Sequence, residues 1–164
     1  MKNLQGFLNY LEFERRYSPL TLNAYHKDLE QFFLFLESDY DIHMEASITD
    51  QMIRSWLAHL MDKGLSSKSV NRKISSIKSY FRYLLRQGVV KTNPSILIQG
   101  PRQKKRLPVF VEERKMEMLI HKEIDFENFE EVRNQLIMEL FYSTGIRRSE
   151  LIHIKIAAID FNNE

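Results

Sequence analysis

The chain has 164 residues, of which 43% are hydrophobic and 28% are charged, so it is expected to form one or two globular domains and is neither disordered nor fibrous. Cysteine is absent, which excludes a disulfide framework and a thiolate metal site and fits a reducing cytoplasm. Residues 1–16 contain no apolar run long enough for a signal peptide or a membrane span.

The charged residues separate along the chain into three blocks of alternating sign. Residues 1–62 hold 5 Lys and Arg against 10 Asp and Glu, residues 63–111 hold 12 against none, and residues 112–164 hold 7 against 12. A basic stretch of this length without a carboxylate is hard to explain as an ordinary salt-bridged surface. It predicts a polyanionic partner such as nucleic acid.

Residues 1–88 are expected to be helical throughout, because their apolar residues recur at spacings of three and four. Ser18, followed by Pro19, is suited to cap one helix, and Ser47 or Thr49 is suited to cap the next. Gly64 and Gly88 are suited to end helices in the left-handed conformation. The four predicted helices span about residues 4–16, 19–37, 50–63 and 67–87.

The pattern changes after Gly88. Asn93-Pro94 and Gly100-Pro101 are typical of turns, and a basic run follows before Leu107-Pro108. We interpret residues 89–108 as a basic linker between two domains. Further helices are expected over residues 112–121, 129–144 and 148–154, and the approach to a strand is expected from residue 156.

The fourth predicted helix has an apolar face and a cationic face, with serines among the cations. Small serines let a helix backbone approach a phosphate backbone while lysines and arginines reach outward. A solvated amphipathic helix explains such a pattern in isolation. The adjoining basic linker and the missing carboxylates favour nucleic-acid binding instead. The candidate DNA-binding residues are Lys68, Arg72, Lys73, Ser75, Lys78, Ser79, Arg82, Arg86, Arg102, Lys104, Lys105 and Arg106.

A second candidate site lies where Gly145 interrupts an apolar helix. Gly145 is suited to a left-handed helix stop, which leaves Arg147 at the corner before the next helix. An arginine held there presents a planar fork of N–H donors that matches two phosphate oxygens. Glu150 is placed to brace that fork. The alternative interpretation is an ordinary helix end with a surface Arg–Glu pair.

Residues Thr144 to Leu151 resemble the Thr-Gly-x-Arg-x-Ser-Glu-Leu signature of tyrosine recombinases of the Xer or phage-integrase type. Upstream residues resemble the arm and linker of that family in order and spacing. They are Ser18-Pro19, Thr21, Tyr25, Leu29, Leu65-Ser66, Val70, Arg72, Lys73, Asn93-Pro94 and Leu107-Pro108. The resemblance implies a mainly α chain with a four-helix, SAM-like core-binding domain in residues 1–88. The linker over residues 89–108 would lead to the truncated, helical N-terminal part of a mixed α/β catalytic domain in residues 109–164.

The resemblance also implies a function. Members of the family cut and rejoin double-stranded DNA through a 3′-phosphotyrosyl intermediate, with several recombinase subunits on the DNA as a homo- or hetero-tetramer, and need no metal or nucleotide cofactor. Arg147 corresponds to the first catalytic arginine, which stabilises charge on the scissile phosphate. Glu150 corresponds to the acidic residue that supports the site. The protein is expected in the cytoplasm, without a membrane partner.

Other members of the family's catalytic set have no counterpart in this chain. Its lysine, His-x-x-Arg pair and nucleophilic tyrosine come later in the family order, and none of the 5 histidines has Arg at the third following position. Ala157-Ala158 also stand where the family often has an aspartate. We therefore expect a fragment that binds DNA without cutting it. The alternatives are a helical DNA-binding regulator with no enzymatic parent, which the coding sequence beyond Glu164 would reveal, and a helical module for an acidic protein.

Overall fold

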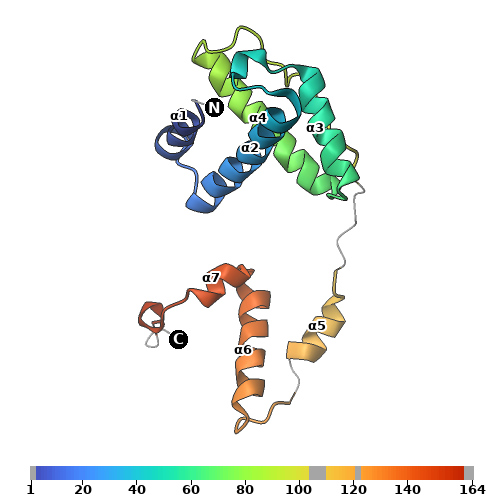
Figure 1. The fold of residues 1–164 in the computed structure, drawn as a ribbon. Coiled ribbons are helices and arrows are strands. Elements are labelled where there is room, and N and C mark those ends of the chain that lie inside the picture. Colours follow the sequence, from blue (N-terminus) through green and yellow to red (C-terminus); the bar gives the residue numbers. More distant parts are fainter. Residues whose placement is uncertain (1–2, 104–109, 121–122, 161–164) are drawn as a thin grey trace. The chain divides into compact units, whose positions relative to one another are not determined.

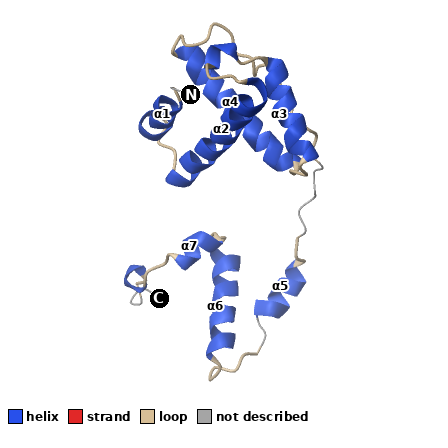
Figure 2. Cartoon of the chain, viewed as in Figure 1, coloured by secondary structure: helices blue, strands red, loops and turns tan. Residues whose placement is uncertain are grey.

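The computed structural model describes residues 3–103, 110–120 and 123–160. Every regular element in these ranges is helical (Figure 1, Figure 2), which confirms the predicted mainly α fold. None of the described helices has both the length and the apolar content needed to cross a membrane. The chain divides into two compact units, residues 1–105 and residues 106–164.

The first unit contains the four predicted helices. They are α1 (Leu4–Asn9), which continues into the π-helical turn Tyr10–Glu14, then α2 (Pro19–Tyr40), α3 (Asp50–Asp62) and α4 (Ser67–Arg86), with a 3-10 turn at Glu45–Ser47. The helix α2 runs three residues beyond the predicted Glu37, because Asp41 adopts the left-handed conformation (φ 52°) that ends it. Arg16 adopts the same conformation (φ 52°) after the π-helical turn and redirects the chain into α2.

Side-chain caps start the helices at the predicted places. The Ser18 hydroxyl accepts a hydrogen bond from the backbone N–H of Thr21 at 3.4 Å, with Pro19 as the first helical residue of α2. Thr49, and not Ser47, caps α3 by accepting from the Met52 backbone N–H at 3.4 Å. Such caps satisfy N–H groups that have no partner inside the helix.

The core of the first unit lies among α2, α3 and α4, with α1 packed on α2 (Figure 1). The Phe32 and Trp56 ring centroids are 5.0 Å apart, and Phe7 meets Tyr80 at 5.3 Å. Each fully buried aromatic side chain stabilises the fold by about 1.5–3 kcal/mol. The buried Tyr80 hydroxyl donates to the Glu45 carboxylate at 3.0 Å, and burial raises the pKa of this phenol far above its usual range. Tyr80 therefore remains a protonated donor.

Residues 89–103 belong to the first unit and pack against its helices. Val90 and Ile98 are buried in its core. The Asn71 side-chain amide donates to the Pro101 carbonyl at 2.9 Å. A Cβ atom at Gly100 would lie 1.6 Å from the Asn71 Oδ1 atom, so any larger residue would have to displace the Asn71 side chain that bonds to Pro101. The first part of the expected linker is thus fixed to α4, whereas residues 104–108 lie outside the described ranges.

The second unit contains α5 (Glu113–Ile120), α6 (Phe129–Thr144), α7 (Arg148–Ile152) and a 3-10 turn at Ile156–Ala158. The helix α5 packs on α6, where the Gln135 side-chain amide donates to the Ile120 carbonyl. No residue of this unit is buried among those the structure describes. The strand approach expected from Ile156 is wrong for residues 156–158, because the Ala158 N–H bonds to the Lys155 carbonyl at 2.9 Å and closes a 3-10 turn.

Candidate nucleic-acid interface

The helix α4 presents most of its predicted DNA-binding residues outside the core. Its apolar residues, such as Ile77 and Phe81, are buried. Three positions carry small or half-buried polar groups, namely Ser75, Lys78 and Ser79. The exposed cations are Lys68, Arg72, Arg82 and Arg86.

Lys73 is the exception, and the structure contradicts its placement at a DNA interface. Only 4% of Lys73 is exposed, and its ammonium group lies 3.0 Å from the Asp28 carboxylate. Asp28 comes from α2 and is itself buried, where it also accepts hydrogen bonds from Arg72 and, at 2.9 Å, from Ser76. A buried, ion-paired lysine is not available to a phosphate. Arg72 keeps about half of its side chain exposed (51%) and remains within the candidate surface.

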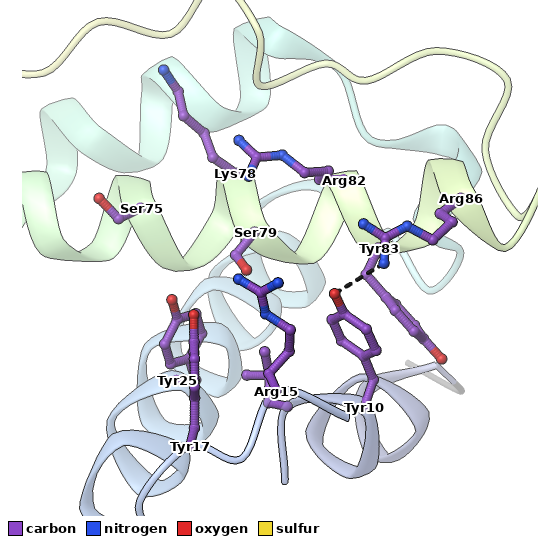
Figure 3. A pocket seen from close by; sticks show the side chains of 11 residues that line it. Tyr10, Arg15, Tyr17, Tyr25, Ser75, Lys78, Ser79, Arg82, Tyr83 and Arg86 are labelled. Carbon is purple, nitrogen blue, oxygen red and sulfur yellow. Dashed lines mark hydrogen bonds between the residues drawn. The ribbon is translucent and has the colours of Figure 1, made fainter. Parts of the chain in front are cut away.

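A groove runs between α4 and the segment that leads from the π-helical turn into α2 (Figure 3). The α4 side of the groove is formed by Ser75, Lys78, Ser79, Arg82, Tyr83 and Arg86. The opposite side is formed by Tyr10, Leu11, Arg15, Tyr17 and Tyr25. Arg15 rises toward Ser79, with Tyr10 to one side of it and Tyr17 and Tyr25 to the other (Figure 3).

Arginine guanidinium groups and tyrosine and serine hydroxyls supply hydrogen-bond donors to the groove. A hydrogen bond from Arg15 to Tyr17 raises the pKa of the Arg15 guanidinium above its usual value. Burial raises the pKa of the Tyr25 phenol, although the hydrogen bond with Ser79 acts in the opposite direction. Arg86 donates to the Tyr10 hydroxyl at 2.9 Å and lies 5.4 Å from that ring centroid. Arg15 is therefore charged and the Tyr25 phenol is protonated.

The basic run beyond α4 begins beside the helix. Arg102 is exposed and follows Pro101 directly, whose carbonyl is bonded to Asn71 of α4. The hydrogen bond places the start of the basic run close to the N-terminal half of α4. The remaining candidates Lys104, Lys105 and Arg106 lie outside the described residues.

The sequence interpretation missed the N-terminal side of the groove. Arg15 belongs to a block of the sequence that is acidic overall, and the tyrosines at positions 10 and 17 carry no recognisable motif. The available signal was the basic pair Arg15-Arg16 immediately before the helix start at Ser18. The structure brings Arg15 to the basic helix from a distance of about 60 positions in the sequence, which periodicity alone does not reveal.

In the second unit, Gly145 ends α6 with a left-handed φ of 63°, which confirms the predicted helix stop. Arg147 is the N-cap residue of α7. One Glu150 carboxylate oxygen accepts from the Arg147 backbone N–H at 2.9 Å, and the other accepts from its guanidinium at 2.8 Å. Glu150 thus braces the arginine as predicted, while 81% of the Arg147 side chain is exposed.

This arrangement predicts a low pKa for Glu150. The hydrogen bond from the Arg147 backbone lowers that pKa most, and the hydrogen bond from the Arg147 side chain adds to the effect. A carboxyl titration followed by NMR should place Glu150 below the ordinary glutamate value. In Arg147→Gln the pKa should rise only part of the way back, because the backbone donor remains. The stabilisation from these bonds is present above the ordinary pKa and is lost as the pH falls through the lowered one. A pKa in Arg147→Gln that returned fully to the ordinary value would contradict the order of the two effects.

Within the described ranges, no three His, Asp or Glu side chains gather closely enough to hold a metal ion. The polar chemistry of both candidate sites is instead that of arginine, lysine and hydroxyl donors. Fixed cations of this kind bind and stabilise phosphate oxygens.

The fold and the groove together define a helical module with a cationic helix on its surface. Residues 4–88 match the family described as phage integrase, N-terminal SAM-like domain. The match covers more than half of the 164 residues, and the chain belongs to this family. The predicted SAM-like domain is confirmed.

Curated relatives extend the likeness to nearly the whole chain. Tyrosine recombinase XerC of Lacticaseibacillus casei is 37% identical over 162 residues, which cover 99% of this chain and 54% of the relative. Tyrosine recombinase XerC of Staphylococcus saprophyticus is 38% identical over 160 residues, which cover 97% and 53%. A crystal structure of XerA recombinase matches with a TM-score of 0.48 and 23% identity, over 96% of this chain and 50% of that one. The predicted likeness to Xer-type tyrosine recombinases is confirmed, and the chain spans about half the length of these relatives.

Proposed function

We propose that this chain binds double-stranded DNA through the cationic surface of α4, as part of a site-specific tyrosine recombinase. The observation that carries the proposal is the groove beside α4, which is lined by Arg15, Lys78, Arg82 and Arg86 and by no carboxylate. A surface on which cations gather without acidic neighbours matches the regular negative charge of a DNA backbone.

The second part of the proposal concerns residues 109–164, which we assign to the start of the catalytic domain after a linker over residues 89–108 and a core-binding domain over residues 1–88. Arg147 would stabilise charge on the scissile phosphate, with Glu150 holding its guanidinium at the corner between α6 and α7. Cleavage and rejoining would proceed through a 3′-phosphotyrosyl link. The tyrosine nucleophile is not among the residues assigned here, so this chain alone is expected to bind DNA without cutting it.

The partners follow from the same proposal. They are double-stranded DNA and further recombinase subunits assembled on it, as a homo- or hetero-tetramer of the full-length protein. No metal or nucleotide is needed, because arginines supply the positive charge that a metal ion would otherwise provide. We propose a cytoplasmic location, which a DNA substrate supports.

Duplex binding measured against salt tests the DNA part of the proposal. Six exposed or half-buried cations of the surface are Lys68, Arg72, Lys78, Arg82, Arg86 and Arg102. If each meets one phosphate, the logarithm of the association constant should fall with the logarithm of salt with a slope of about −5. Affinity should then drop by roughly 10³-fold between about 50 and 200 mM salt. Fluorescence anisotropy with a labelled duplex would measure both quantities.

Two results would contradict the proposal. One is the absence of detectable duplex binding at low salt, and the other is an affinity that barely changes with salt. If excess duplex failed to displace a polyglutamate probe from this surface, the partner would instead be an acidic protein.

A further inference from the structure

The groove beside α4 has a second wall that the basic stretch of the sequence does not contain. Arg15 and Tyr17 lie on either side of Arg16, whose left-handed conformation (φ 52°) turns the chain between the π-helical turn and α2. Both flanking residues line the groove, whereas Arg16 does not. A left-handed arginine costs about 1–2 kcal/mol of conformational energy, and such strain is often retained where it positions functional side chains.

The cations of the groove are not neutralised by the protein. Arg15, Lys78, Arg82 and Arg86 form no ion pair within the part of the chain that the structure describes. The neighbouring Arg72 differs, since it is paired with Asp28. Like charges gathered in this way repel one another in the free protein, and an anion in the groove would relieve that repulsion.

The uncharged groups of the groove match a phosphate better than a base. Tyr17, Tyr25 and Ser79 supply hydroxyl donors next to the Arg15 guanidinium (Figure 3). The tyrosine rings contact one another, with centroids 6.0 Å apart for Tyr17 and Tyr25 and 5.3 Å apart for Tyr10 and Tyr83. Rings that are already paired offer little free face for stacking on a base. Guanidinium and hydroxyl donors suit the non-bridging oxygens of a phosphodiester, and no carboxylate lines the groove to compete for them.

We propose that this groove holds the sugar–phosphate backbone of one strand of a DNA duplex, and that Arg15 is a phosphate contact supplied by the N-terminal segment. The inference rests on the proposed function and deepens it, because it adds a contact from outside the basic stretch. The backbone lies between two walls, with Arg82 and Arg86 of α4 on one side and Arg15 and the Tyr17 hydroxyl on the other.

Salt-dependent duplex binding of Arg15→Gln, with Arg16→Gln as the matched control, tests this placement. Both changes remove one exposed positive charge from adjacent positions, but only Arg15 lines the groove. We expect Arg15→Gln to make the salt slope shallower by about 0.9 and to lower affinity at about 0.1 M salt by roughly eightfold. Arg16→Gln should leave the slope unchanged. Far-UV circular dichroism and the fluorescence of the buried Trp56 would show that both variants are folded.

Tyr17→Phe separates the hydroxyl from the charge. It should lower affinity by about threefold without changing the slope, because the phenol donates a hydrogen bond but carries no charge. The inference is overturned, and the proposed function stands, if the parent chain binds duplex and Arg15→Gln behaves like Arg16→Gln. It is also overturned if single-stranded DNA binds more tightly than duplex, keeps its affinity in Arg15→Gln and Tyr17→Phe, and loses it in Tyr17→Leu, since the groove would then be a stacking site. A parent chain that fails to bind duplex at low salt overturns both proposals.

Discussion

Asp28→Asn is expected to destabilise the first unit by about 3–5 kcal/mol, because it leaves the buried ammonium group of Lys73 without a counter-charge. Asp28 and Lys73 are 1% and 4% exposed, so water cannot replace the lost partner. Asp28 also holds Ser76 and Arg72, and all of these contacts join α2 to α4. Urea unfolding followed by the fluorescence of Trp56, the single tryptophan of the chain, would report on this unit.

The double variant Asp28→Asn, Lys73→Met provides the control for this prediction. Removing both charges of a buried pair is often close to neutral, because neither charge then needs a partner. Most of the lost stability should therefore return. Two results would show that an unpaired Lys73 charge is not the cause. One is a double variant no more stable than Asp28→Asn, and the other is an Asp28→Asn variant that loses less than about 1 kcal/mol of unfolding free energy.

Replacing Lys78, Arg82 and Arg86 together by glutamine should lower duplex affinity by about 10²–10³-fold at about 0.1 M salt. Each phosphate contact contributes about 0.9 to the salt slope, so the slope should become shallower by roughly 2.7. The three residues lie on successive turns of α4 and line one groove, where no carboxylate competes for them. Fluorescence anisotropy over a salt series would measure the affinity and the slope together.

The matched control removes three exposed cations of the same unit that lie outside the groove, namely Arg54, Lys63 and Lys91. Both variants have the same net charge, so a difference between them reports on position and not on total charge. The control should keep most of the affinity and nearly the whole slope. Equal losses in the two variants would mean that DNA is attracted by the overall charge and not by the groove. Because Arg86 also bonds to Tyr10, unfolding curves should accompany the measurement.

Local features of the fold could be predicted from the sequence because local chemistry determines them. Ser18 and Thr49 cap helices since a short side-chain oxygen satisfies a free N–H, and Gly145 ends α6 since a left-handed residue favours glycine. The apolar stripe of α4 was equally readable from its period. The corner at Arg147 and Glu150 belongs to the same group, because its two partners are three residues apart.

Features that depend on distant partners could not be predicted in this way. Lys73 counts among the cations of the basic stretch, but the carboxylate that pairs with it away from solvent comes from α2, 45 positions earlier. Arg15 enters the groove through a π-helical turn and a left-handed arginine, neither of which has a reliable sequence signal. The two errors have a common cause, because both depend on α2 and the segment that precedes it. Asp28 of α2 neutralises Lys73 of α4, whereas Arg15 of the preceding segment adds a positive charge beside the cations of α4.

The packing of residues 89–103 bears on how this module can be exchanged between proteins. The family match stops at residue 88, yet Val90 and Ile98 fill the core, and Gly100 touches Asn71 of α4. A graft limited to residues 4–88 would lack the core side chains of Val90 and Ile98 and would leave a cavity beside α4. Each large apolar side chain lost should lower the free energy of unfolding by about 2–5 kcal/mol. The piece that can be inherited or transplanted as one unit therefore extends at least to Pro101, whose carbonyl is bonded to Asn71. A transplanted unit of that length could also include Arg102, which follows Pro101 and is the first cation of the basic run beside α4.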